Sequence, residues 1–253
     1  MKSIFVLRVS LLVVVVGALA PCAVAGVVAP NGDATTEGNS NNVWPFSAGW
    51  FGTNSTSRDQ QVYNASQFGA SGSTLNIGAI AFRFDSAVNP QTETDFFPNI
   101  EIDLSTTVVS ADHMSTAFGK NIGADDTVVY SGPLTLTGTA LGQSPNPFNL
   151  IINLQTPFLY NTARGNLLLD IKINAPGSFP ISALDADSTL GDGTSRLWSA
   201  TTGSVNDIIG NADTFGLVTE FLPPTGAPEP STLALGGLAL VGAGLLRTRT
   251  RRP

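Results

Sequence analysis

The sequence predicts an all-β domain, an antiparallel β-sandwich or jelly roll with short helical turns, from three observations. Apolar residues recur at every second position in several segments, which is the period of a strand with one buried face. Clusters of glycine, proline, asparagine and aspartate separate these segments, as turns do between short strands. No long segment has the 3.6-residue apolar period of an amphipathic helix. The chain has 253 residues, and its middle part of about 180 residues suits a single domain.

Four segments show this alternation most clearly, and each has one apolar face and one more polar face, as strands of an antiparallel sheet do. These strands are expected at 79–84, 100–104, 148–154 and 167–173. Shorter candidate strands lie at 127–130, 134–137, 196–200 and 215–221. Two short helical turns are expected at 64–68 and 115–121, and the second is interpreted as a cap over one sheet edge, with a functional lid as the alternative.

The charge of the chain is divided unevenly between its middle and its ends. The formal net charge is −7, but six of the 12 lysines and arginines lie within residues 1–8 and 247–252. Residues 26–227 therefore hold six basic residues against 18 of the 19 acidic ones, a net charge of −12. Contacts to phosphates need clustered cations, so this composition argues against a nucleic-acid partner.

Residues 1–25 have the layout of a secretory signal peptide. A positively charged start precedes an apolar run, which ends at the small-x-small site Ala23-Val24-Ala25. Such a segment engages the secretion machinery, and cleavage is expected after Ala25, so that Gly26 begins the mature chain. The alternatives are an uncleaved anchor and lipidation of Cys22, although Pro21 stands where a lipoprotein has a small residue. Cleavage after Ala25 removes the only cysteine, so the mature domain would fold without a disulfide.

A second membrane-directed segment closes the chain. A proline-rich linker, 223–230, ends in Pro228-Glu229-Pro230, and Ser231 begins a transmembrane helix expected at 231–246. Its apolar part has 15 residues, which at ~1.5 Å per residue span roughly 22 Å, short of the ~30 Å hydrocarbon core, so the helix is a marginal permanent anchor. The basic tail 247–253 stays cytoplasmic by the positive-inside rule. Its cations are Arg247, Arg249, Arg251 and Arg252.

These three elements together resemble the PEP-CTERM sorting tail. The Pro-Glu-Pro-Ser motif, the short apolar helix and the arginine cluster follow one another in register over 228–252. The resemblance implies that the partner is exosortase, a membrane transpeptidase of Gram-negative bacteria, that it reads Pro228, Glu229 and Pro230, and that the helix and arginines are then removed. The two prolines keep this site extended, which suits a protease substrate. An ordinary tail anchor behind a proline linker is the alternative.

Between the two ends, the sequence predicts a linker or loosely attached first strand at 26–42 and a β-sandwich ectodomain at 43–222. Parts of this ectodomain also resemble one group of PEP-CTERM surface proteins. The similar stretches are 60–68, 77–85, 118–126 and 166–170. That resemblance implies an exported bacterial domain and adds no catalytic residue.

The residues of the domain give little support for an enzyme, and no catalytic residue is assigned. The single histidine, His113, follows Asp112 directly, and adjacent side chains of a strand point to opposite faces, so His113 is interpreted as a surface residue. No Gly-x-Ser-x-Gly sequence is present to hold a nucleophile. Glu101 and Asp103 would share one strand face, as a glycosidase pair can, but the apolar pattern predicts that this face is solvated.

The oxygen-rich segment 185–193 is the candidate metal loop. It departs from an EF-hand, because Leu190 stands where that loop needs glycine and Arg196 stands where it needs glutamate. The preferred interpretation is a solvated turn capped by aspartates. A looser calcium site is the alternative, and no cofactor is assigned.

Exposed aromatic residues on a β-sandwich would favour carbohydrate binding. The candidates are Trp44, Trp50, Phe51, Tyr63 and Trp198. Near the start of such a domain an aromatic side chain more often closes the open end of the core. The sequence therefore predicts an exported, non-enzymatic surface or extracellular-matrix protein that is anchored transiently at the inner membrane. A module that binds extracellular polysaccharide is the alternative.

Overall fold

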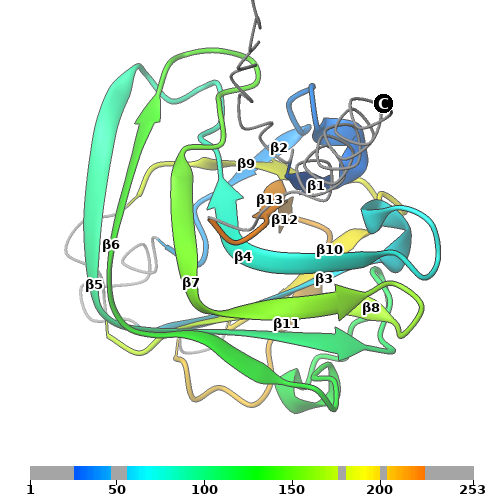
Figure 1. The fold of residues 1–253 in the computed structure, drawn as a ribbon. Helices are drawn as coiled ribbons and strands as arrows, with labels where there is room; N and C mark the ends of the chain where they lie inside the picture. Colours follow the sequence, from blue (N-terminus) through cyan, green and yellow to red (C-terminus); the bar gives the residue numbers. More distant parts are fainter. Residues whose placement is uncertain (1–25, 47–55, 176–180, 200–203, 226–253) are drawn as a thin grey trace, which may run out of the picture. The chain divides into compact units, whose positions relative to one another are not determined.

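Antiparallel β-strands make up most of the domain, as the two-residue period predicts (Figure 1). The computed structural model describes residues 26–46, 56–175, 181–199 and 204–225, which belong to one compact unit, Ala25–Pro228. The predicted signal peptide and the predicted sorting tail lie outside the described residues.

The described strands form three antiparallel sheets. The four-stranded sheet has the order β1 (Val27–Ala29), β13 (Thr219–Leu222), β4 (Thr74–Phe82) and β7 (Leu150–Asn161). The six-stranded sheet has the order β11 (Asn211–Asp213), β10 (Thr194–Trp198), β3 (Ser57–Tyr63), β8 (Asn166–Ile173), β5 (Gln91–Thr107) and β6 (Thr127–Ala140). The small sheet consists of β12 (Gly216–Leu217), β9 (Leu184–Asp187) and β2 (Ser40–Asn42). The helical turns are η1 (Asn31–Asp33), η3 (Ala65–Phe68) and η4 (Phe118–Lys120).

The core lies between the four-stranded and the six-stranded sheets. Tyr63 of β3 and Phe221 of β13 come from these two sheets, and their rings make a T-shaped contact with centroids 5.0 Å apart. The Tyr63 hydroxyl donates a hydrogen bond to Thr219 Oγ1 at 2.8 Å, so the polar end of this side chain is satisfied inside the core. The apolar residues at alternate positions of 100–104 and 167–173 are buried here, as the sequence predicts.

β5 and β6 form the longest strand pair, and Figure 1 shows them side by side as a curved ribbon. The sequence predicts two short strands, 127–130 and 134–137, divided by a turn at Ser131-Gly132-Pro133. One strand, β6, instead runs through this point. Gly132 adopts φ +126°, and the register with β5 shifts beside it. A glycine-based irregularity therefore bends the strand without ending it.

The connection between β5 and β6, residues 108–126, covers the outer face of the six-stranded sheet. Phe118 in this connection is fully buried, and the Arg58 guanidinium lies 4.7 Å from the centroid of its ring. The Gln60 side chain donates to Phe118 O at 3.2 Å and accepts a hydrogen bond from Asn121 Nδ2 at 3.0 Å. The helical turn predicted at 115–121 is present as η4, but it covers a sheet face and not an edge, because its aromatic ring packs on β3.

Residues 26–42 contribute two strands to the domain, so of the two predicted alternatives the structure has a first strand and not a linker. β1 pairs with β13, and β2 pairs with β9. The segment has few apolar residues, but backbone pairing with two sheets orders it all the same. Because β1 and β13 are antiparallel with Val27 opposite Phe221, residues 26 and 222 lie at the same end of this strand pair.

Candidate functional site

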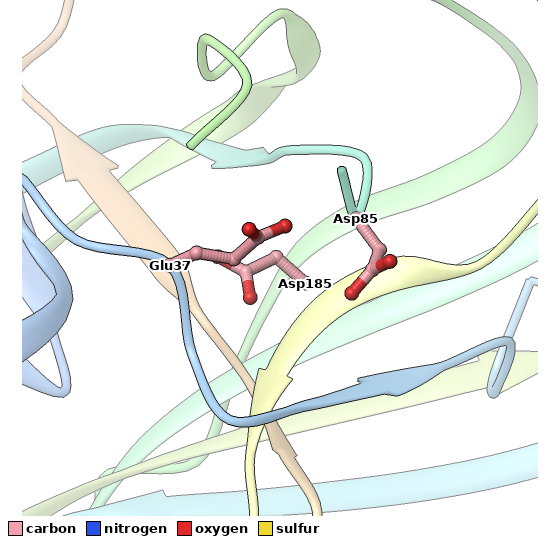
Figure 2. Close-up of side chains that lie close together, drawn as sticks. All are labelled: Glu37, Asp85 and Asp185. Carbon is pink, nitrogen blue, oxygen red and sulfur yellow. The ribbon is translucent and has the colours of Figure 1, made fainter. Parts of the chain in front are cut away.

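Three carboxylates from separate segments converge beside the small sheet. Glu37 precedes β2, Asp85 follows β4, and Asp185 lies on β9. One oxygen of each lies within 4.8 Å of the others, and Figure 2 shows the three side chains coming together from different parts of the chain. Glu37, Asp85 and Asp185 are called the acidic cluster below. Among the residues that the structure describes, this is the group that could hold a metal ion.

Arg83 explains why the acidic cluster is stable in this place. Its side chain is buried, and Nε donates to Asp185 Oδ2 at 2.6 Å. Nη2 donates to the backbone oxygens of Asp33 and Thr36 at 2.9 and 2.6 Å. One guanidinium thus neutralises Asp185 and also fixes the segment that carries Glu37.

The protein itself supplies most hydrogen bonds to these carboxylates. Glu37 accepts hydrogen bonds from the Ser86 N–H and the Ser144 hydroxyl, both at 2.5 Å. Burial alone would raise the pKa of Glu37, but these hydrogen bonds outweigh it and lower the pKa. Asp185 also accepts from the Gly38 N–H at 2.9 Å, yet burial raises its pKa to about 6 despite the nearby Arg83. Asp85 accepts from the Ala87 N–H at 2.8 Å.

Chemically, the acidic cluster resembles the oxygen set that calcium prefers, but its charge is already compensated. Calcium takes six to eight oxygen ligands. Both oxygens of Glu37 and both of Asp185 accept hydrogen bonds or an ion pair from the protein. A cation would have to compete with Arg83 for Asp185. The arrangement therefore serves first to join three distant segments of the chain.

The predicted metal loop 185–193 does not stay together as one site. Asp185 points into the acidic cluster (Figure 2). Asp187 Oδ1 accepts from the Thr189 N–H, and Asp192 Oδ1 accepts from the Thr194 N–H, each at 2.7 Å. The turns are capped by aspartates as the preferred interpretation expects, but the loop is not fully solvated, because Asp192 Oδ2 is buried without a hydrogen-bond partner among the described residues. Sequence reasoning missed Glu37 and Asp85, because only the long-range pairing of β2 with β9 and the Phe84–Leu184 bridge bring them to Asp185.

The candidate catalytic residues are placed as follows. His113 is exposed, as predicted. Glu101 and Asp103 share a strand face, but this face is only partly solvated: Asp103 is 2% exposed beneath the connection that covers the sheet, whereas the Glu101 side chain is 32% exposed. Both carboxylates form ion pairs with Lys172 Nζ, at 2.9 and 2.5 Å respectively. The prediction of a solvated face was wrong for Asp103, because the apolar pattern of one strand does not reveal that the connection 108–126 covers it.

Of the three candidate aromatic residues that the structure describes, Trp44 and Tyr63 are buried and Trp198 is half-buried. Trp44 is 3% exposed and Tyr63 is fully buried. The Trp44 ring contacts the Trp198 ring edge-on at 5.6 Å, and Trp198 Nε1 donates to Asp213 Oδ2 at 2.9 Å. Trp44 is therefore a buried residue that packs on Trp198, which agrees with the buried position preferred for aromatics at the domain start and not with an exposed platform. Trp50 and Phe51 lie outside the described residues.

Asp59 is a buried acid close to this pair of tryptophans. It stands opposite Trp198 in the pairing of β3 with β10 and is 4% exposed. Its Oδ2 has no hydrogen-bond partner among the described residues. Burial raises the pKa of Asp59 to about 8; the nearby Arg196 acts against this shift, while Asp213 and Asp170 add to it. This carboxyl is therefore protonated over much of the neutral pH range.

The comparisons with known proteins concern the C-terminal end. Residues 227–252 match the PEP-CTERM protein-sorting motif, at the place where the sequence resembles it. The match includes the motif Pro228-Glu229-Pro230 with Ser231, and the terminal arginines. No curated protein matches the chain. In the part of the chain that the structure describes, no helix has the length and apolarity needed to span a membrane, and the predicted helix 231–246 lies outside that part.

Proposed function

We propose that this chain is a structural or adhesive protein of the bacterial cell surface or extracellular matrix. The observation that carries the proposal is the sorting motif at 227–252, which implies an exported protein processed by exosortase. The signal peptide leads the N-terminus out, and the terminal arginines hold the other end at the cytoplasmic side. The acidic domain between them is therefore delivered outside, and the short helix holds it at the inner membrane only until processing.

The ordered ends of the domain fit this topology. β1 begins at Val27, one residue after the predicted start of the mature chain at Gly26. β13 ends at Leu222, just before the proline-rich linker 223–230. Residues 26 and 222 lie at the same end of the β1–β13 pair. Both membrane-directed segments thus attach to the same end of this strand pair, as expected of a domain tethered on one side.

A non-enzymatic role is part of the proposal. The ion pairs of Glu101 and Asp103 with Lys172 support it, since this cation already holds both carboxylates and Asp103 is buried, whereas a general acid or base needs an accessible group. Stability rests on the apolar core and buried ion pairs, because removal of residues 1–25 would leave no cysteine.

Deletion of 247–253 in the exporting bacterium tests the proposal. Without the arginines, the tail loses its cytoplasmic hold and its recognition, so unprocessed or mislocalised precursor should accumulate on immunoblots of membrane and medium fractions. A variant with Thr248→Ala and Thr250→Ala keeps all four arginines of 247–252 and is the matched control. Normal amounts of mature protein in the deletion strain, or a full-length chain with both ends uncut in the cytosol, would overturn the proposal.

A further inference from the structure

The six cations of the mature domain fall into two groups. Four of them form ion pairs with carboxylates at distances between 2.5 and 2.9 Å. These pairs are Arg58–Asp170, Arg83–Asp185, Lys172–Glu101 with Lys172–Asp103, and Arg196–Asp213. The side chains of Lys120 and Arg164 have no ion pair or hydrogen bond with any other residue that the structure describes. In a domain with 18 acidic residues and six basic ones, two cations without a carboxylate partner are unexpected.

Lys120 and Arg164 line the same pocket, although 44 positions separate them in the chain. Lys120 ends η4, and Arg164 lies in the turn between β7 and β8. The pocket has a volume of about 390 Å³ and also includes Thr106, Val108 and Asp125. We call it the cationic pocket.

Two glycines bring its walls together at the end of β5. A Cβ on Gly123 would overlap the Thr106 carbonyl oxygen, so only glycine allows the covering connection to come this close. Gly165 has φ +145°, and a Cβ on it would lie 2.5 Å from the Thr107 carbonyl oxygen. The segments that carry Lys120 and Arg164 therefore both pack on the last residues of β5.

The cationic pocket is a positive site on a negative domain. Asp125 is its single acidic residue, and Asp125 Oδ1 already accepts a hydrogen bond from the Thr106 N–H at 2.6 Å. Its three charged side chains sum to +1, against −12 for residues 26–227. At physiological ionic strength the Debye length is about 8 Å, so a ligand in the pocket experiences mainly these nearby charges.

We propose that the cationic pocket binds the carboxylate of an acidic sugar, a uronate unit of an extracellular polysaccharide. A planar carboxylate matches the two parallel N–H donors of a guanidinium, and a lysine adds a second, less directional charge. Val108 is 94% exposed and gives the C–H face of a sugar ring an apolar contact, while Thr106 gives a polar atom for its hydroxyls. A pocket of this volume suits one or two sugar rings. That the natural ligand is an extracellular polymer rests on the proposed extracellular location. The ability of the pocket to bind a uronate does not depend on that location.

Binding of the exported protein to a short oligogalacturonate, measured by calorimetry, tests this site. The double substitution Lys120→Gln with Arg164→Gln should weaken binding by about tenfold or more, because two charge-assisted contacts are lost. Lys120→Arg should keep most of the affinity, since it retains the charge. Both side chains are exposed, so the thermal midpoint should stay unchanged in these variants.

Three further probes identify the ligand class. A neutral oligogalactose of the same length should not bind, inorganic phosphate should compete only weakly, and poly-glutamate should bind less tightly than the uronate oligomer. Unchanged uronate binding by the double variant, equal binding of the neutral oligomer, or tighter binding of phosphate or poly-glutamate would each overturn the assignment. These outcomes leave the sorting proposal intact, because its test follows processing and location alone.

Discussion

The acidic cluster and the cationic pocket use charge in opposite ways. In the cluster, the buried Arg83 guanidinium lies 2.6 Å from Asp185 and also donates to two backbone oxygens, so its charge is compensated inside the fold. In the pocket, Lys120 and Arg164 are exposed and have no carboxylate partner among the described residues. The difference suggests that paired charges here order the chain, whereas the two unpaired cations are available to a ligand.

Replacement of Arg83 should give the largest loss of stability, and it tests whether a paired, buried cation contributes more to the fold than an unpaired, exposed one. Arg83→Met leaves Asp185 as an uncompensated buried charge, and it releases the segment that carries Glu37. We expect a loss of about 3–5 kcal/mol in the free energy of unfolding, measured with denaturant. Arg164→Met is the matched control, and it should change stability by at most about 0.5 kcal/mol. Equal losses of unfolding free energy in the two variants would contradict the distinction between buried, paired cations and exposed, unpaired ones.

Trp44→Ala tests whether this aromatic residue belongs to the core or to a binding surface. Trp44 is 3% exposed and packs on Trp198. We expect a loss of about 3 kcal/mol in unfolding free energy, at the lower end of the range for a large aromatic residue. The affinity for oligogalacturonate should not change at a temperature where the variant is folded. A stable variant with weakened sugar binding would instead support an aromatic platform.

Asp59→Asn should have a smaller effect that depends on pH. The pKa of Asp59 in the folded protein, about 8, lies above the ordinary value of 3.8. The folded state therefore binds more protons than the unfolded state between these values, and stability should fall as pH rises from about 4 to 8. The substitution removes this dependence, so the variant should be more stable than the original by about 1–3 kcal/mol at pH 8 and similar to it at pH 4. Parallel stability curves for the two proteins, from chemical unfolding at several pH values, would contradict this reasoning.

The sequence predicts at least part of β4, β5, β6, β7, β8, β10, β12 and β13, but it misses β3, β9 and β11 and the groupings of the charges. The period of two identifies the buried residues of 100–104 and 167–173, because a strand's own pattern determines which face is apolar. The same pattern fails for Asp103, because a covering segment more distant in the chain decides whether the outer face meets water. Glu37 falls in a segment with few apolar residues, and only strand pairing brings it to Asp85 and Asp185.

The cationic pocket was beyond prediction for a related reason. Lys120 and Arg164 are ordinary polar residues in two turns, and neither lies in a motif. Their convergence depends on close packing of Gly123 and Gly165 against β5. The requirement for glycine at these two positions follows from the backbone conformation and from the close neighbour, and neither can be read from the sequence alone.

The position of β13 has a mechanical consequence. It lies between β1 and β4, and the chain leaves it directly toward the tail. The ladder bonds of antiparallel strands run perpendicular to the strand axis. A pull directed along β13 from the tail therefore loads the bonds to both neighbours in shear, all at once, instead of opening them one after another. With the proposed C-terminal anchor, tension would therefore enter the domain at β13, a strand with a paired neighbour on each side.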